Sequence, residues 1–126
     1  MKKFVFSFAF ILLLLVVSKG YSQSAVYFCT ETGAYGFAYG YSTESEAKTE
    51  AYNTCISYGG TNPVLITSTY QKGYGAIALG NDANGNRVIG VAVGFSTLTG
   101  AKNEALKQCK DYGGYDVKIE NTWNDN

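Results

Sequence analysis

The chain has 126 residues, with ten basic and ten acidic side chains, three cysteines and no histidine. The length allows one small domain, and the absence of histidine excludes a Ser-His-Asp triad, a Cys-His pair and an imidazole zinc site. The balanced charge offers no basic surface to nucleic acid. These numbers exclude several classes of protein but disclose no activity, and no cofactor is expected.

The N-terminal segment has the pattern of an export signal. Two lysines precede an apolar run over residues 4–17, which is shorter than the roughly 20 residues of a membrane span and matches the apolar region of a signal peptide. Small residues at positions 20 and 22 favour cleavage before Gln23. We predict a signal peptide over residues 1–22; a cut a few residues later and an uncleaved anchor are the alternatives.

Cleavage leaves one domain, residues 23–126, that works in the periplasm or outside the cell. It retains seven basic and ten acidic residues, a net charge of −3, which disfavours polyanions as partners. No later segment is apolar for long enough to re-enter a membrane. Lipid attachment at Cys29 is not expected, because the bulky Phe28 precedes it.

The strongest internal signal is a repeat. Residues 36–60 and 90–114, offset by 54, are identical at 13 of 25 positions without a gap. We therefore predict a duplicated unit closing on itself, with repeat one at about 25–70 and repeat two at about 74–121. The expected fold class is α+β, with two ββαβ units, an antiparallel or mixed sheet and two helices.

Each repeat contains the same sequence of predicted elements. Short apolar strands are expected at about 25–29 and 74–80, and alternating strands follow at 35–41 and 89–95. The helices begin after Ser42 and Ser96, and the Thr43-to-Glu46 segment has the form of a capping box, whereas Gly100 weakens the second helix start. Last strands are expected at 64–69 and about 115–121, followed by a frayed polar tail at 124–126.

The small residues predict how each helix packs. Alanine and cysteine recur every four residues on each helix, and glycine and alanine make one face of each alternating strand nearly bare. We expect each helix to lie on the bare face of its own strand, which buries the bulky faces against each other. The alternative buries the bulky faces under the helices.

The ordered motifs resemble a known family. They are Gly75-Ala76-Ile77-Ala78, the Tyr35-Gly36 segment through Ser42, and an alanine-rich helix from Ala47 to Cys55, each pattern occurring twice. This pattern resembles the exported bacterial family catalogued as domain of unknown function 4189, over about residues 25–120. The resemblance implies export, duplication and disulfides, and no established catalytic activity. The second cysteine that family members often carry after each Gly-Gly pair is missing here.

Three cysteines allow one intramolecular bridge at most. Cys29–Cys55 is the first candidate, since a strand and the helix covering it would carry them; Cys29–Cys109 is the second. The bridge would stabilise the fold by roughly 3 kcal/mol. Cys109 then fills the helix stripe as a buried thiol, with a reactive or intermolecular thiol as the alternative.

The aromatic strand is the main candidate binding face. Tyr35, Phe37, Tyr39 and Tyr41 occupy alternate positions and could stack on a sugar ring or a partner's edge. The second repeat has aliphatic residues at most of the same places, which favours a role in the core.

Other candidate chemistry is weak. The 81–86 loop resembles a calcium loop in composition only, so no metal site is expected. Its Asn84-Gly85 pair is typical of a hairpin turn. Glu50 and Glu104 occupy equivalent helix positions, which indicates a structural duty more than a hydrolytic pair.

These observations favour an exported, non-catalytic domain that binds a protein or envelope component, for example as an inhibitor or immunity-type protein. The alternative is a small carbohydrate-binding or hydrolytic domain that uses the tyrosine-rich strand. The sequence does not define the partner or the oligomeric state.

Overall fold

The computed structural model describes residues 22–125. The predicted signal peptide lies, except for Ser22, outside the described residues and stays a prediction. The described chain forms eight elements in order: β1 (Gln23–Phe28), β2 (Tyr35–Tyr41), α2 (Glu44–Ser57), β3 (Val64–Thr69), β4 (Gly73–Asn81), β5 (Arg87–Phe95), α3 (Leu98–Asp111) and β6 (Tyr115–Asp125). This is the ββαβ unit occurring twice, which confirms the α+β fold class.

The strands are divided between two sheets. Each has three antiparallel strands, in the orders β2-β1-β3 and β5-β4-β6. The sequence predicted one antiparallel or mixed sheet. The structure has two sheets instead, because each repeat forms a sheet of its own. Each first strand is central because it pairs with the strand before and the strand after its helix.

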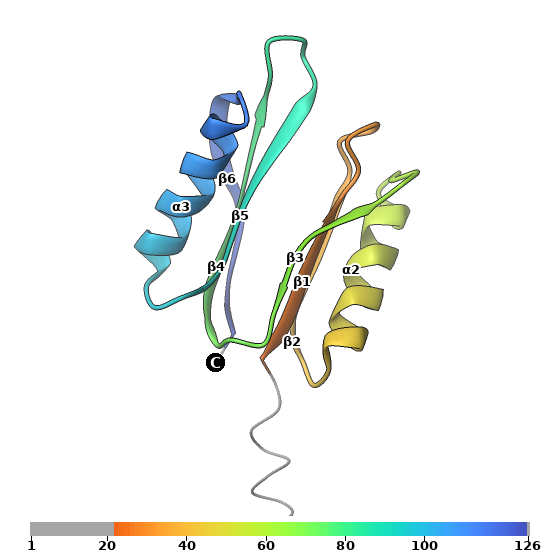
Figure 1. The fold of residues 1–126 in the computed structure, drawn as a ribbon, viewed down its shortest axis with the longest axis vertical. Coiled ribbons are helices and arrows are strands. Elements are labelled where there is room, and N and C mark those ends of the chain that lie inside the picture. The colour runs from red at the N-terminus through yellow and green to blue at the C-terminus, as the bar shows by residue number, and fades with distance from the viewer. Residues whose placement is uncertain (1–21, 126) are drawn as a thin grey trace, which may run out of the picture.

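The two sheets face each other, and the helices cover their outer faces (Figure 1). Between the sheets, Val26 and Phe28 of β1 belong to one buried cluster with Ile77 of β4, Val91 of β5 and Trp123 of β6. β2 contacts β6, and the equivalent β5 contacts β3. The bulky strand faces are therefore buried against each other, as the preferred packing prediction required.

The helices pack very closely on the bare strand faces. A Cβ atom at Gly36 would lie 2.2 Å from the carbonyl oxygen of Ala51, and one at Gly90 would lie 2.0 Å from that of Ala105. Both alanines are fully buried. The small-residue stripe is thus the surface through which each helix backbone approaches its own sheet. Close packing of small side chains serves this contact, and a strongly apolar helix is not needed for it.

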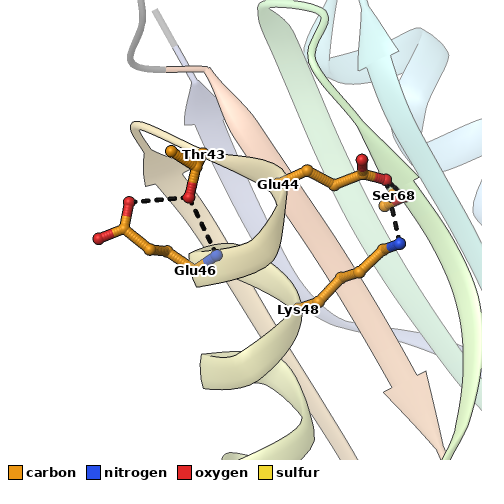
Figure 2. Close-up of polar contacts among 5 residues, drawn as sticks. All are labelled: Thr43, Glu44, Glu46, Lys48 and Ser68. Carbon is orange, nitrogen blue, oxygen red and sulfur yellow. Dashed lines mark hydrogen bonds and ion pairs between the residues drawn. The ribbon is translucent and has the colours of Figure 1, made fainter.

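The capping box predicted for the first helix is present (Figure 2). The Glu46 amide donates to Thr43 Oγ1 over 3.1 Å, and the Thr43 hydroxyl donates to Glu46 Oε1 over 2.9 Å. Next to it, Glu44 pairs with Lys48 at 3.2 Å and accepts from the Ser68 hydroxyl at 2.8 Å. The last contact ties the helix start to β3.

The second helix begins more simply. Thr97 Oγ1 accepts from the Gly100 amide over 3.0 Å, and no carboxylate stands at the third helical position. The missing carboxylate and Gly100 are the features from which the sequence predicts a weaker first turn, and its lower stability stays a prediction. Neither helix of the described region, each 14 residues long, has the length and apolar character that crossing a bilayer requires.

The last strand is longer than predicted. The tail was expected to fray, but β6 continues to Asp125, and Trp123 and Asp125 are both buried. The indole fits there because position 75 is glycine: a Cβ atom would lie 2.1 Å from the Trp123 ring. The Gly40 amide donates to Asp125 Oδ2 over 3.3 Å and so fixes the end of the strand to the other sheet.

Candidate functional site

Three of the four predicted aromatic residues share one face. Tyr35, Phe37 and Tyr39 form a row of nearly parallel rings along β2, with centroids 6.5 and 6.4 Å apart. Trp123 covers this row from β6, 5.1 Å from Phe37 and 5.9 Å from Tyr39. The row therefore lies between the two sheets, where its rings stack on one another and on Trp123.

Tyr41 does not belong to that face. It packs against Ala25, Ala38 and the alanines of α2. The cause is Gly40, whose φ of +76° accompanies a register shift in the β1–β2 pairing and reverses the side-chain alternation. The expectation of a four-residue aromatic platform is wrong in this respect. Tyr39, 47% exposed, is the most accessible ring of the remaining three.

The second repeat shows the same reversal. Gly94 has a φ of +72°, the β4–β5 register shifts opposite it, and Phe95 packs on the α3 side. The bulge therefore belongs to the repeated unit. Trp123 is the aromatic residue that the sequence did not single out, since it lies between the strand predicted at about 115–121 and the tail predicted at 124–126.

The predicted disulfide is not formed. Cys29, Cys55 and Cys109 are all buried free thiols in this structure. Cys29 and Cys55 share a buried cluster, but their sulfur atoms face different oxygens: Cys29 Sγ lies 3.6 Å from Thr61 Oγ1, and Cys55 Sγ donates to the Ala34 carbonyl over 3.5 Å. The prediction assumed that sharing a strand and its covering helix would aim the two sulfur atoms at each other.

The thiols have different environments. Burial raises the pKa of Cys55 and of Cys109. Hydrogen bonds from the Thr32 side chain and the Asn62 amide lower the pKa of Cys29 to about 6, outweighing the effect of burial. Cys109 donates to the Val88 carbonyl over 3.5 Å, the contact equivalent to that of Cys55, and fills the helix stripe as predicted.

The remaining candidates do not form a reactive group. Glu50 and Glu104 lie on α2 and α3, which cover opposite outer faces (Figure 1). Asp82 Oδ1 accepts from the amides of Asn84 and Asn86 at 2.9 Å each, which makes the 81–86 loop a hairpin turn. Within residues 22–125, no three metal-ligating side chains gather to hold an ion.

The structure does bring side chains together at the end of the sandwich where the β1–β2 and β4–β5 hairpins lie. A cleft of about 620 Å³ opens there on the β2–β6 side. It includes two of the predicted aromatic residues, Tyr35 and Phe37. Its polar side chains come from both halves and include Thr54, Tyr58, Asn81 and Asn121. The Tyr35 hydroxyl donates to Asn121 Oδ1 across the two sheets, and burial raises the Tyr35 pKa.

A second cleft, of about 500 Å³, lies at the same end on the β3–β5 side. Phe28, Ile66, Val88 and Ile89 give it apolar walls. Both clefts share the same four wall residues, which are Thr30, Glu31, Asn86 and Arg87.

Arg87 is the only arginine of the chain. Its Nη1 atom donates to the Gly33 carbonyl oxygen over 2.9 Å. In the described part of the chain, the ion pairs are Lys48–Glu44 and Lys107–Asp111, so the guanidinium has no carboxylate partner there. Glu31, which lines both clefts as well, accepts from the Thr61 hydroxyl over 3.1 Å. The clefts thus share one positive and one negative group.

These features define a class: a duplicated domain of two face-to-face sheets between two helices, with paired clefts at its hairpin end. The chain matches the family described as Domain of unknown function (DUF4189) over residues 21–124, and it belongs to that family. The family resemblance noted from the motifs is thereby confirmed. No curated protein and no solved structure matches the chain.

Proposed function

We propose that this protein is an exported, non-catalytic domain that binds a protein or another component of the cell envelope, in the periplasm or outside the cell. The observation that carries the proposal is the pair of clefts at the hairpin end, which share the exposed Arg87 and Glu31. Concave sites with a few converging polar groups are the usual form of a ligand site. The N-terminal signal pattern supports export.

The chemistry of the clefts supports binding more than catalysis. The titratable side chains that line the clefts are one arginine, Arg87, the carboxylates of Glu31 and Asp82, and tyrosines, and the three thiols are buried away from the solvent. A hydrolase needs a nucleophile within hydrogen-bond reach of a base, or two carboxylates flanking the scissile bond. Glu31 and Asp82 line the second cleft, but Asp82 is engaged by the backbone of its own turn.

Export is tested by mass spectrometry of the protein recovered from the periplasmic and culture fractions. The expected mass is that of a chain beginning at Gln23 with free thiols. Recovery of the full 126-residue chain from the cytosolic fraction would contradict the export proposal, whereas its recovery from the membrane fraction would indicate the uncleaved anchor.

Binding is tested by replacing single tyrosines with the photoreactive benzoylphenylalanine. Tyr58 lines the first cleft and Tyr112 the second, and both are highly exposed. Tyr70 is as exposed as Tyr58, at 73%, but lines neither cleft, so it is the matched control. Irradiation in the envelope fraction should crosslink one shared component from positions 58 and 112 and not from 70. Equal crosslinking from all three positions would contradict the proposal.

One observation favours a second candidate, a carbohydrate-binding domain. Tyr35, Phe37 and Tyr58 line the first cleft together with asparagine side chains, and such groups also recognise sugars. Trp123 lies against this aromatic row, so its fluorescence should change on titration with envelope glycans if the candidate is correct. An unchanged spectrum with peptidoglycan fragments would exclude it.

A further inference from the structure

The two clefts are copies of one another. With the 54-residue offset, Tyr58 in the first cleft corresponds to Tyr112 in the second, and Thr54 corresponds to Gln108. Gly33, beside the first cleft, corresponds to Arg87, and these two residues contact each other. Equivalent residues in contact must lie at the axis that relates the two halves. The two clefts therefore adjoin each other across this axis and are lined by equivalent positions of the two repeats.

The copies have diverged in chemistry. Tyr35 of the first cleft is replaced by Ile89 in the second, and Ala34 is replaced by Val88. Both clefts carry hydroxyl and amide groups, but the second is the more aliphatic, with Val88 and Ile89 where the first has Ala34 and Tyr35. A ligand that occupies both must carry a polar group and an apolar group side by side.

The shared walls carry complementary hydrogen-bonding groups. The Arg87 guanidinium has five N–H donors, of which one is used on the Gly33 carbonyl. The Glu31 carboxylate is an acceptor, and only the Thr61 hydroxyl donates to it among the described contacts. A donor and an acceptor that line the same clefts match a peptide group, whose carbonyl can accept from the arginine and whose N–H can donate to the glutamate.

The edge of β3 adds a further complementary feature. β3 is an outer strand of its sheet, contains no charged residue, and exposes Val64, Leu65 and Ile66. Ile66 itself lines the second cleft. Unpaired backbone groups of an outer strand are a template for an extended peptide, and edges that avoid this carry charges. The equivalent strand β6 does carry them, at Lys118 and Glu120.

A sugar fits these features less well. Phe37 and Tyr39 already stack against Trp123 and against each other, and the second cleft has Ile89 where the first has Tyr35. We propose that the two clefts form a single peptide-binding groove, in which an extended segment of a partner protein crosses the axis over Arg87 and Glu31. An apolar side chain enters the second cleft and a polar side chain the first. This inference rests on the proposed binding function and names its ligand class.

The test is an NMR titration of the ¹⁵N-labelled exported protein. The probes are blocked peptides that carry one leucine and one asparagine in either order, separated by glycine spacers of increasing length. At least one spacing should shift amide signals in both clefts, at Gly33 and Tyr58 on one side and Ile89 and Tyr112 on the other. Replacing the leucine by glycine should remove the shifts at Ile89 and Tyr112.

Variants of the groove give a second readout. Arg87→Gln and Ile66→Ser should each weaken binding by about tenfold, the effect of losing a charged hydrogen bond or a buried aliphatic contact. The matched control is Lys118→Gln, which removes a positive charge outside both clefts. The fluorescence of Trp123 checks that each variant is folded, and Glu31→Gln provides an independent variant of the shared wall.

The proposal is overturned if no peptide shifts either cleft at concentrations of about 1 mM, the range of very weak binding. It is also overturned if the shifts stay in the first cleft and peptidoglycan fragments reproduce them. Crosslinking from positions 58 and 112 separates the two hypotheses: if it succeeds while the peptides fail, the peptide inference falls and the proposed binding function stands.

Discussion

Arg87 Nη1 donates to the carbonyl oxygen of Gly33 over 2.9 Å, and these two residues occupy the same position in the two halves. The contact joins the β4–β5 hairpin to the β1–β2 turn at the axis between the repeats. Gly33 permits it in two ways: its φ is +78°, and a Cβ atom there would lie 3.2 Å from Arg87 Cβ. The contact therefore holds Arg87, one of the four residues that line both clefts, against the first repeat.

Replacing Gly33 by alanine should destabilise the fold in two ways, through backbone strain at the positive φ and through the close contact with Arg87. Gly85 has a similar φ of +83° but nothing within 4 Å of a Cβ atom, so Gly85→Ala is the matched control for backbone strain alone. We expect Gly85→Ala to lower the free energy of unfolding by about 1 kcal/mol and Gly33→Ala by about 2 kcal/mol. Urea unfolding followed by Trp123 fluorescence measures both. Equal losses would show that the Arg87 contact is loose.

The closest helix–strand approach predicts a larger effect. Alanine at Gly90 would place a methyl group 2.0 Å from the Ala105 carbonyl oxygen and 2.6 Å from the Cys109 nitrogen, both backbone atoms that cannot move alone. Gly90→Ala should therefore cost about 3 kcal/mol, at the upper end of overpacking substitutions. Gly36→Ala should behave alike. The measurement is chemical unfolding of each variant, and a loss below about 1 kcal/mol would contradict the packing described above.

The repeat made this packing predictable, because the same small residues recur at the same spacing in both halves. The packing of each helix could therefore be predicted from two consecutive elements, one strand and the helix that follows it. The orientation of Tyr41 was not predicted in this way. Tyr41 leaves the aromatic face because Gly40 adopts a positive φ, and glycine in an alternating strand does not by itself indicate a bulge.

The clefts could not be predicted from the sequence, because they depend on how the two halves are placed. Tyr58 and Tyr112 are equivalent residues of separate units, and only the axis near Arg87 makes them line adjoining clefts. The burial of Trp123 has the same origin, since its partner Phe37 belongs to the other repeat. The direction in which each cysteine sulfur points was likewise decided by turn residues such as Thr61.

The capping box should make the first helix start more sensitive than the second. Thr97→Ala removes one acceptor for the Gly100 amide and should cost about 1 kcal/mol. Thr43→Ala removes the equivalent acceptor and also the hydroxyl that donates to Glu46, so its cost should be larger. Unfolding of the two variants in parallel tests this. A greater loss at Thr97 would contradict the role of the carboxylate.

The same carboxylate gives a pH dependence. Hydrogen bonds from the Ser42 and Thr43 hydroxyls hold the pKa of Glu46 below its ordinary value of 4.5. The folded state therefore favours the charged form, and this contribution to stability is present above the ordinary pKa and is lost as the pH falls through the lowered one. The difference in unfolding free energy between wild type and Glu46→Gln should be constant near neutrality and vanish in acid.

Asp125 should show the opposite dependence. Burial raises the pKa of this carboxyl above its ordinary value of 3.8, against the opposing effects of the Gly40 amide and Lys72. The folded state then holds the proton more tightly than the unfolded state, so stability decreases as the pH rises from the unfolded pKa through the raised folded one. Asp125→Asn keeps an oxygen for the Gly40 amide and removes the buried charge.

We expect Asp125→Asn to be more stable than wild type at neutral pH and to lose this advantage at a pH below 3.8, where both states of the wild-type carboxyl are protonated. Thermal unfolding over a range of pH values measures the difference. Asp111→Asn is a suitable control, because that carboxylate is exposed and paired with Lys107 on the surface of α3. A variant less stable than wild type at neutral pH would contradict this prediction. It would mean that the hydrogen bond between the Gly40 amide and the charged carboxylate outweighs the cost of burying the charge. The charge would then anchor the end of β6 to the first sheet.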